Sequence, residues 1–407
     1  MRTAADIVIV GGGIFGCAVA WNLARLGARH VILIERGEIG TASTSRAAGL
    51  LTRVRTKAGQ TALAQQTRQA IAELEEELGE SVGVRKVGSL HVAASEGSSA
   101  GLEDLRRVAE TCKEPFATID RAEAEQRVPW LDAGDAMDLL MMPDEAFVDP
   151  YLLASFFARA ARQRGVEVRT AETVIGLVRE GQRVLGVRTE KETIHAGCTI
   201  DAAGPWSGLL SFEAGYHLPI TPIRSHYWIT EPRPIFPDDH PCVILPDARA
   251  YTRPEVGGLL FGLRDRTSAS CDPRSLPEDL GSLRFGDEPH GHEALTESGP
   301  LLENFFPGLS DIGIAHYIAG PSTYTPDGQF VLGRLPGVDG MVVCSGCCGA
   351  GIAVSGGVGL AIAELAHTGE TSFDLEACRP DRFGGIDAFG VEWQRRCAAA
   401  RSEKTSG

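Results

Sequence analysis

A glycine motif near the start of the chain has the residue types and the spacing of a dinucleotide-binding turn. It follows four apolar residues and precedes a run of small ones, and it comprises Gly11, Gly13, Ile14, Phe15 and Gly16. In a GxGxxG turn the first glycine permits the tight bend, the second admits a pyrophosphate against the backbone, and the third lets a helix pack on a strand. The start of that helix would present backbone amides to the phosphates.

An acidic residue follows at the distance that a ribose requires. Glu35 lies nineteen residues after Gly16, at the end of a second apolar run, and Arg36 comes next. A carboxylate in this position accepts hydrogen bonds from the ribose hydroxyls. Strand, glycine turn, helix and strand together predict a βαβ unit that binds a nucleotide, and the alternative is a glycine turn that serves packing only.

A hydroxyl-rich loop favours FAD over NAD as the nucleotide. It begins about ten residues beyond Glu35, so it could follow a longer, bent cofactor. Hydroxyl groups near its start can donate hydrogen bonds to a pyrophosphate, and its later backbone can pass the edge of a flavin ring. The predicted contacts are Thr44, Ser45, Arg46, Ala48, Gly49, Leu50 and Leu51.

Two later segments would complete this site from distant parts of the sequence. The first gives the predicted contacts Val174, Ala203, Gly204 and Trp206. The second is a turn that opens a helix, and its predicted contacts are Gly346, Gly349, Ala350, Gly351 and Ile352. Amides and the positive end of a helix could stabilise the negative charge that a reduced flavin carries at its pyrimidine edge.

The composition makes several kinds of partner improbable. The chain has 407 residues, 43% of them hydrophobic, with 39 basic and 54 acidic side chains and a formal net charge of −15. A surface this acidic repels nucleic acid and anionic lipid. No stretch approaches the roughly 20 apolar residues that span a bilayer. We therefore expect a cytoplasmic protein that acts on a small molecule.

The ten cysteines indicate free thiols in a reducing compartment, because nearly all of them are scattered. Only Cys344, Cys347 and Cys348 lie close together. Their CxxC spacing has no second pair of cysteines or histidines beside it, so we expect no metal site.

The pattern of apolar runs predicts an α/β fold (α+β overall). We expect a Rossmann-like FAD-binding domain with an inserted substrate domain of mixed or antiparallel sheet, since prolines and aromatic residues interrupt short strand-like runs from residue 216 to 319. The predicted boundaries are 1–85, 145–215 and 320–385 for the FAD-binding domain, 86–144 and 216–319 for the substrate domain, and 386–407 for a polar C-terminal tail.

Individual elements can also be predicted. Helical spacing of apolar residues indicates helices at 60–79 and 98–113. Asp149 followed by a proline predicts the start of another helix, which extends to residue 164. Strand-like runs lie at 166–169, 184–189, 199–202 and 340–344.

Several segments resemble the D-amino-acid-oxidase superfamily of FAD enzymes. They are the glycine-rich start with Glu35-Arg36, the loop at 44–49, the segment Ala-Ala-Gly-Pro-Trp-Ser207 and the late Gly-Ala-Gly-Ile352. More narrowly, several stretches are similar to the dimethylglycine and sarcosine dehydrogenase branch: 227–232, 251–253 with 257–262, 320–328, 374–375 and 382–383. The resemblance covers about residues 5–385, and it implies FAD and an amine or amino-acid substrate.

The sequence departs from that branch in two respects. Many members bind FAD covalently through a histidine in the loop after Glu35, whereas this chain has Arg46 there, so we expect non-covalent FAD. The members also carry a C-terminal folate-binding half, and the resemblance here is to the oxidase half alone. A released one-carbon unit would then leave as formaldehyde.

The substrate pocket is harder to place. Related amino-acid oxidases have an arginine just before a threonine–proline–aspartate turn, but residues 322–324 are Ser-Thr-Tyr. An arginine elsewhere could bind a substrate carboxylate with two hydrogen bonds, or it could serve a structural ion pair; the candidates are Arg46, Arg224 and Arg253. Aromatic residues could cover the flavin ring, or could belong to the core; the candidates are Tyr227, Tyr251, Tyr324 and His226, the last as a base or a polar wall.

Three functions are compatible with these features. The first is oxidation of a secondary or tertiary amine, such as an N-methyl or cyclic amino acid. The second is oxidation of a primary amino acid such as glycine or a D-amino acid. The third is a flavin-binding electron-transfer subunit. The electron acceptor, either oxygen or an electron-transfer protein, and the oligomeric state stay open.

Overall fold

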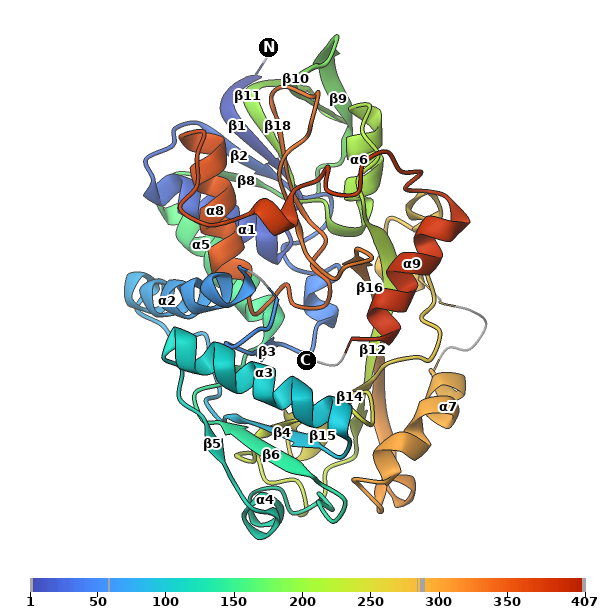
Figure 1. Cartoon of the computed structure of the whole chain (residues 1–407). Coiled ribbons are helices and arrows are strands. Elements are labelled where there is room, and N and C mark those ends of the chain that lie inside the picture. The colour runs from blue at the N-terminus through green and yellow to red at the C-terminus, as the bar shows by residue number, and fades with distance from the viewer. Residues whose placement is uncertain (1–2, 58, 284, 286–289, 405–407) are drawn as a thin grey trace.

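Two large sheets organise the chain in the computed structural model, which describes residues 3–57, 59–283, 285 and 290–404. One sheet lies in the upper half of Figure 1 and the other in the lower half. Each contains eight strands. Residues far apart in the sequence meet between them, and this junction holds the site described below.

The first sheet has a parallel centre. Its main path is β17-β18-β11-β1-β2-β8, with β10 and β9 added as antiparallel strands beside β11. Because β1, β11 and β18 run parallel, their carboxyl ends meet at one edge. The strands are β1 (Thr3–Val10), β2 (Val31–Ile34), β8 (Glu167–Arg169), β9 (Val174–Glu180), β10 (Arg183–Thr189), β11 (Thr193–Asp201), β17 (Val331–Arg334) and β18 (Met341–Ser345).

Strand β1 shows why this sheet is buried on both faces. Ile7 and Ile9 belong to the core under the helices, whereas Val8 and Val10 belong to the core on the opposite face. Successive side chains of a strand point to opposite faces, so a run of four apolar residues fits a strand covered on both sides.

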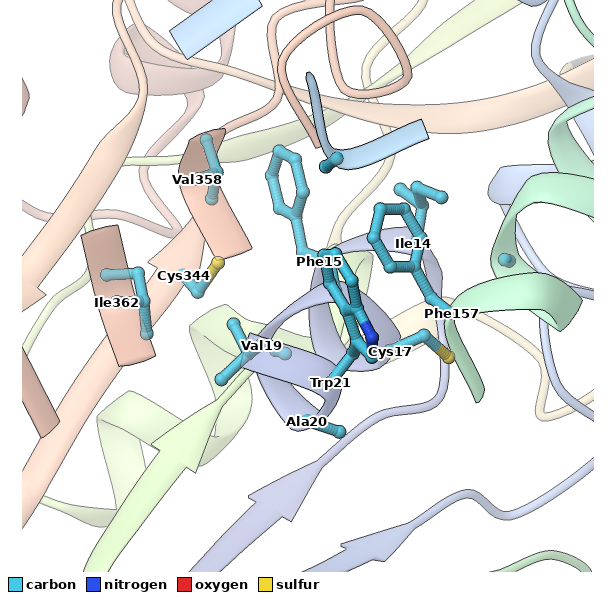
Figure 2. Close-up of a cluster of buried hydrophobic side chains, with 14 of the residues drawn as sticks. Ile14, Phe15, Cys17, Val19, Ala20, Trp21, Phe157, Cys344, Val358 and Ile362 are labelled. Carbon is cyan, nitrogen blue, oxygen red and sulfur yellow. The ribbon is translucent and has the colours of Figure 1, made fainter. Parts of the chain in front are cut away.

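Helices cover one face of the first sheet. They are α1 (Ile14–Arg25), α2 (Gln60–Leu78), α5 (Pro150–Gln163) and α8 (Ser355–His367). Figure 2 shows α1 between Phe157 of α5 and Val358 and Ile362 of α8. The contact with α8 needs small residues, because a Cβ on Gly359 would lie 2.6 Å from the Cβ of Ala18. The small-residue run after the glycine motif therefore serves close helix packing.

The second sheet is mostly antiparallel and has the order β16-β12-β15-β14-β13-β4-β6-β5. Only β4 and β13 pair in parallel. Helices α3 (Glu96–Cys112), α4 (Arg121–Arg127) and α7 (His292–Glu303) accompany it. The strands are β4 (Ser89–Ala93), β5 (Ala117–Thr118), β6 (Asp138–Met142), β12 (Thr221–Thr230), β13 (Cys242–Leu245), β14 (Ala250–Glu255), β15 (Gly258–Leu263) and β16 (Ile314–Tyr324).

Short elements join these layers. Strands β3 (Leu50–Leu51) and β7 (Ala146–Phe147) form a small antiparallel pair, and α6 (Ser207–Glu213) follows the first sheet. Among the described helices none is both long enough and apolar enough to cross a bilayer. The two large sheets draw on the segments expected for two domains, and the exact boundaries stay a prediction.

The predicted helices and strands are largely confirmed. The helices expected at 60–79, 98–113 and 150–164 are α2, α3 and α5, and the side chain of Asp149 accepts a hydrogen bond from Leu152 N as an N-cap. The strand-like runs correspond to β8, β10, β11 and β18. Strand β9 was not predicted, because its side chains do not alternate regularly between buried and exposed.

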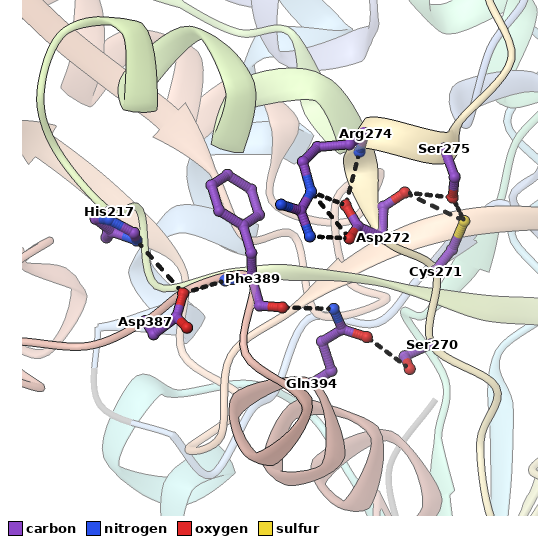
Figure 3. A network of polar contacts seen from close by, with 9 residues as sticks. All are labelled: His217, Ser270, Cys271, Asp272, Arg274, Ser275, Asp387, Phe389 and Gln394. Atoms are coloured by element: carbon purple, nitrogen blue, oxygen red, sulfur yellow. Dashed lines mark hydrogen bonds and ion pairs between the residues drawn. The ribbon is translucent and has the colours of Figure 1, made fainter.

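The expectation of a polar C-terminal tail is wrong. Residues Val391–Ser402 form helix α9, which packs against β12 and β16 and buries Trp393, Cys397, Ala398, Arg401 and Ser402. Figure 3 shows how the preceding turn is held: Gln394 donates to the carbonyl of Phe389 and accepts from Ser270, while Asp387 contacts His217. This segment is therefore part of the fold.

Candidate active site

A cavity lies where the carboxyl edge of the first sheet meets the second sheet. The start of α1, the loop at 43–50, the turn after β18 and the end of α9 all contribute to its wall. Seventeen of the predicted residues line it: Gly13, Ile14, Phe15, Thr44, Arg46, Ala48, Gly49, Leu50, Gly204, His226, Tyr227, Tyr251, Tyr324, Gly349, Ala350, Gly351 and Ile352. The structure thus brings together seven stretches of the chain that are separate in sequence.

The glycine motif has the close backbone geometry that a pyrophosphate turn requires. Gly11 has a φ of +109°, in the region that favours glycine. A Cβ on Gly16 would lie 1.9 Å from the carbonyl oxygen of Gly11, so a larger residue could not be accommodated without a shift of helix or turn. Gly13 is the N-cap of α1, has no side chain of its own to cap the helix, and lines the cavity.

Glu35 is held beside the glycine turn. Its carboxylate accepts hydrogen bonds from Gly12 N at 2.7 Å and from Gly37 N at 2.8 Å. A carboxylate has about four acceptor positions, so it can still accept from ribose hydroxyls. The guanidinium of Arg36 lies over the ring of Trp206 at 3.5 Å. Glu35, Arg36 and Trp206 all lie outside the wall of the main cavity.

Side chains of the hydroxyl-rich loop make hydrogen bonds within the protein that the sequence does not predict. Thr44 Oγ1 accepts a hydrogen bond from Ile14 N at 3.0 Å and so caps helix α1. Ser45 donates to the carbonyl oxygen of Thr41 at 3.0 Å and does not line the cavity. Arg46 Nη1 donates to the carbonyls of Thr41 and Ala42, both at 2.8 Å. The predicted contact between Ser45 and a pyrophosphate is therefore not supported.

The other predicted cofactor residues lie outside the cavity wall, and most have a structural task there. Leu51 pairs with Ala146 between β3 and β7. Ala203 N donates to Asp201, and Val174 packs against the core of the first sheet. The residues outside the wall are Gly11, Gly16, Glu35, Arg36, Ser45, Leu51, Val174, Ala203, Trp206 and Gly346.

The turn after β18 forms the opposite wall. Gly346 and Gly349 have φ values of +67° and +71°. A Cβ on Gly349 would lie 2.6 Å from the hydroxyl oxygen of Tyr324, so glycine is required for the ring of Tyr324 to lie against this turn. The thiol of Cys347 lies 3.2 Å from the hydroxyl of Ser322. No group of three or more metal-ligating side chains occurs in the part of the chain that the structure describes.

Aromatic side chains from the second sheet line the same cavity as this turn. Burial raises the pKa of Tyr227 and of Tyr324 to about 12, so both stay protonated near neutral pH. The ring of Tyr251 lies directly over Gly262 of the neighbouring strand, where a Cβ would come within 2.2 Å of it. The glycine in β15 therefore leaves room for this ring.

His226 is a buried wall residue. Its Nδ1 lies 3.0 Å from Tyr317 Oη and its Nε2 lies 3.4 Å from Asp265. Burial lowers the pKa of His226 although Asp265 favours its charged form. Burial alone would raise the pKa of Asp265, but His226 and Arg224 hold it at about 2.

Two of the proposed carboxylate anchors are engaged elsewhere. Arg253 does not line the cavity: it donates to the carbonyls of Ala48 at 2.6 Å and Pro254 at 2.8 Å, and it pairs with Glu255. Arg224 pairs with Asp265 at 2.8 Å and also lies outside the wall. Both guanidinium groups already have acceptors, so neither is a suitable anchor.

The cavity also contains four cationic residues that were not among the predicted site residues: Arg55, Arg264, Arg401 and Lys404. Arg55 follows the hydroxyl-rich loop, and Arg264 follows β15. Arg401 lies in α9, and Lys404 comes just after that helix. No local motif marks them, and only Arg55 stands near a predicted contact in the sequence.

The residues around the cavity fit FAD. The glycine turn, Glu35 and Thr44 suit the nucleotide end, whereas the turn at 349–352 and the tyrosines suit a flat ring. The positions where a Cβ would collide, at Gly11 and Gly16, are those that a phosphate-binding turn needs. When bound, FAD supplies a hydride acceptor.

Comparison with known proteins agrees with this fit. At 28% identity the chain is similar to the mitochondrial pyruvate dehydrogenase phosphatase regulatory subunit of Mus musculus, over 94% of this chain and 44% of that protein. It is also 28% identical to mitochondrial sarcosine dehydrogenase of Homo sapiens, over 90% of this chain and 40% of that protein. The chain thus spans less than half the length of these relatives.

A solved structure and a family match complete the comparison. The fold is similar to that of L-proline dehydrogenase from P. horikoshii, with a TM-score of 0.81, 24% identity, and coverage of 94% of this chain and 98% of the other. Residues 6–365 match the FAD dependent oxidoreductase family DAO. The expected family, α/β fold and FAD cofactor are therefore confirmed. The chain belongs to the DAO family of FAD-dependent oxidoreductases.

Proposed function

We propose that the protein oxidises a secondary or tertiary amine, such as an N-methyl or cyclic amino acid. A carbon–hydrogen bond next to nitrogen is broken, its hydride passes to the flavin, and the resulting iminium is hydrolysed by water. With an N-methyl substrate the products would be the demethylated amine and formaldehyde. The observation that carries the proposal is the cavity itself, which Tyr227, Tyr251 and Tyr324 line together with the turn at 349–352.

The side chains around the cavity would orient the amine and exclude water. Tyr227 and Tyr324 stay uncharged near neutral pH, since burial raises the pKa of each to about 12. Tyr251 adds a third aromatic surface, and His226 forms a buried polar wall. A pocket lined by aromatic rings and by cationic side chains disfavours a further positive charge, so it favours the neutral amine, which is the form that can lose a hydride. The similarity to sarcosine dehydrogenase supports this substrate class.

Two other functions stay candidates for specific reasons. Oxidation of a primary amino acid would use the same cavity with a smaller substituent on nitrogen. A role as a flavin-binding subunit is favoured by the similarity to a phosphatase regulatory subunit. The well-formed aromatic cavity argues for a substrate of its own, so we place amine oxidation first.

Anaerobic flavin reduction tests the proposal. The purified yellow protein would receive sarcosine, dimethylglycine, N-methyl-L-aspartate, proline, glycine or D-alanine, with loss of the flavin absorption band as the measurement. Bleaching by N-substituted or cyclic amines, and not by glycine or D-alanine, is expected. Bleaching by glycine or D-alanine alone would favour the primary amino acid. No bleaching by any amine, together with a protein that co-purifies in equal amount, would contradict an independent enzyme.

A further inference from the structure

A second cavity adjoins the candidate active site, and we name it the outer cavity to distinguish it from the first, or inner, cavity. Helix α3, residues 52–60 and the C-terminal end of α9 contribute to its wall. Figure 1 shows α3 close to that end of α9. Four residues line both cavities: Arg55, Tyr324, Ala350 and Lys404. The two cavities therefore meet, and these four residues form the passage between them.

Solvent exposure of the inner wall is greatest next to this passage. Of the described residues that line the inner cavity, Gly349 alone is classed as exposed rather than buried or partly exposed. A Cβ on Gly349 would lie 2.6 Å from Tyr324 Oη and 3.2 Å from Lys404 Nζ. The exposed point of the inner wall thus lies beside two of the residues that both cavities share.

The cofactor end of the inner cavity is a poor entrance for a substrate. Gly13, Ser43 and Gly204 are partly exposed there. They belong to the glycine turn, the hydroxyl-rich loop and the segment after β11, which are the segments that fit FAD. Bound FAD would cover these residues, so a substrate needs another way in.

A further groove beside the inner cavity is also a poor entrance. Among the described residues it shares only Arg46 with the inner wall. Arg46 Nη1 donates to the carbonyls of Thr41 and Ala42, both at 2.8 Å, which holds this side chain between the groove and the inner cavity.

The outer cavity opens to solvent. Seven of its lining residues are exposed: Thr56, Lys57, Gly97, Gly101, Asp104, Asp327 and Glu403. They include one lysine and three acidic residues, so the lining carries charges of both signs. An amino acid also carries both signs near neutral pH. Such a lining suits a zwitterion better than it suits an apolar amine.

The residues of the passage differ in how firmly they are held. Arg55 is 8% exposed, and its Nη2 donates to Thr52 Oγ1 at 2.6 Å. Tyr324 is 2% exposed. Lys404 follows α9 and is partly exposed, and its Nζ donates to the carbonyl of Cys348 at 3.1 Å. Because a lysine has a flexible four-carbon chain, Lys404 is the member that can yield to a passing molecule.

We propose that the substrate enters the active site through the outer cavity and the passage, and that the length of Lys404 limits the size of the amines that pass. The inference rests on the proposed amine oxidation for the identity of the molecule that passes. The route itself applies to any small molecule that reaches the flavin.

Tryptophans in the outer cavity test the route. Gly101→Trp and Glu403→Trp place a ring there from α3 and from the end of α9, and neither position lines the inner cavity. A Cβ on Gly101 would have no heavy atom of another part of the described chain within 4 Å, so this variant is expected to fold. Glu110→Trp is the matched control, because it adds the same ring at an exposed position of α3 that lines neither cavity.

Anaerobic stopped-flow reduction of the flavin is the measurement. We expect the second-order rate constant for N-benzylglycine, a bulky amine, to fall at least fivefold in each outer-cavity variant and to stay unchanged in Glu110→Trp. The limiting rate at saturation should stay unchanged in all three, because the added rings lie outside the inner cavity. Sulfite adds to flavin without amine chemistry, and its rates of addition and release should fall together with an unchanged Kd.

The length of Lys404 is tested apart from its charge. Lys404→Ala and Lys404→Met both remove the charge, but methionine keeps most of the length. The kcat/KM for N-benzylglycine relative to that for sarcosine should rise at least threefold in Lys404→Ala and stay near its original value in Lys404→Met.

The outcomes separate the route from the proposed function. Unchanged rate constants in both outer-cavity variants, or a fall no larger than in Glu110→Trp, would overturn the route and leave amine oxidation standing. The same ratio of the two amines in Lys404→Ala and Lys404→Met would overturn the role of Lys404. Slower sulfite addition and release in the outer-cavity variants, without reduction by any amine, would support the route and contradict amine oxidation.

Discussion

Position 16 must be a glycine for the cofactor-binding turn to keep its shape. A Cβ there would meet the carbonyl oxygen of Gly11 at 1.9 Å, so the turn or the helix would have to shift. We expect Gly16→Ala to destabilise the protein by about 1–3 kcal/mol and to reduce its FAD content at least tenfold. The flavin-to-protein absorbance ratio and urea denaturation measure both effects.

A helical glycine without that constraint provides the control. Gly101 lies inside α3 and is exposed, and a Cβ there would have no heavy atom of another part of the described chain within 4 Å. Gly101→Ala should keep normal FAD content and be neutral or stabilising by up to about 1 kcal/mol. An alanine at position 16 that binds FAD normally would contradict the role assigned to the turn.

Asp201 makes folding stability depend on pH in an unusual direction. Burial raises the pKa of this carboxyl to about 6, against hydrogen bonds from Ala203 N and Ser211. The folded state then binds more protons than the unfolded state between about pH 4 and 6, so stability contributed by Asp201 is present below pH 4 and is lost as pH rises through 6. The loss is about 3 kcal/mol.

Asp201→Asn tests this effect. An amide can accept from Ala203 N and donate to Ser211, but it cannot ionise. We expect the variant to exceed the natural protein in unfolding free energy at pH 8 by up to about 3 kcal/mol, and to match it near pH 4. The exposed Asp311→Asn should show no such difference. A variant that is less stable at pH 8 would contradict the assigned pKa.

The sequence allowed some of these residues to be predicted and not others. Gly11, Gly13 and Gly16 stand in one local motif whose spacing has a physical cause, so their place beside the cavity could be foreseen. Arg264 and Arg401 are single arginines in unrelated segments, and only long-range pairing of strands and helices brings them together. Arg253 was a reasonable candidate anchor, and its contact with Ala48 could not be predicted without that pairing.

At the scale of elements, helix α9 connects stability with the site. Trp393 is 5% exposed and lies 5.2 Å from the ring of Phe383. Trp393→Ala should destabilise α9 by about 3–5 kcal/mol and make it sensitive to proteases while the sheets stay folded. Limited proteolysis and urea denaturation measure this. Val391→Ala, at an 83% exposed position of the same helix, should change neither.

The contrast between α1 and α9 explains why one element was foreseen and the other was not. Helix α1 follows a strand and a glycine turn and buries ten consecutive residues, so the pattern is strong. Helix α9 buries Arg401 and Ser402 along with its few apolar side chains. Because polar residues occupy part of its buried face, hydrophobic periodicity gives a weak signal.

At the scale of the whole molecule, ligand binding and folding should be coupled across both sheets. The cavity wall includes Gly13 beside the first sheet and Tyr251 and Tyr324 of the second. FAD at 100 times its Kd should raise the unfolding free energy by about 2.7 kcal/mol. Trp21 lies in the core of the first sheet and Trp228 in the core of the second. A variant that keeps Trp21 but not Trp228, and one that keeps Trp228 but not Trp21, can therefore report on the two cores separately.

Both reporters should shift together when FAD is added to the FAD-free protein. Urea denaturation followed by tryptophan fluorescence checks this. If FAD shifted only the Trp21 transition, the second sheet would not take part in holding the cofactor, and the cavity would have to be assigned to the first sheet alone.

The distance in sequence between the walls of the cavity has a consequence for biosynthesis. The wall begins at Gly13 and includes Lys404, so it cannot be completed until residue 404 has left the ribosome. At about 5–20 residues per second, this delay is on the order of tens of seconds. The nascent chain would therefore hold its glycine turn exposed for most of its synthesis. Nascent molecules would have no active site, and catalysis would begin only after translation.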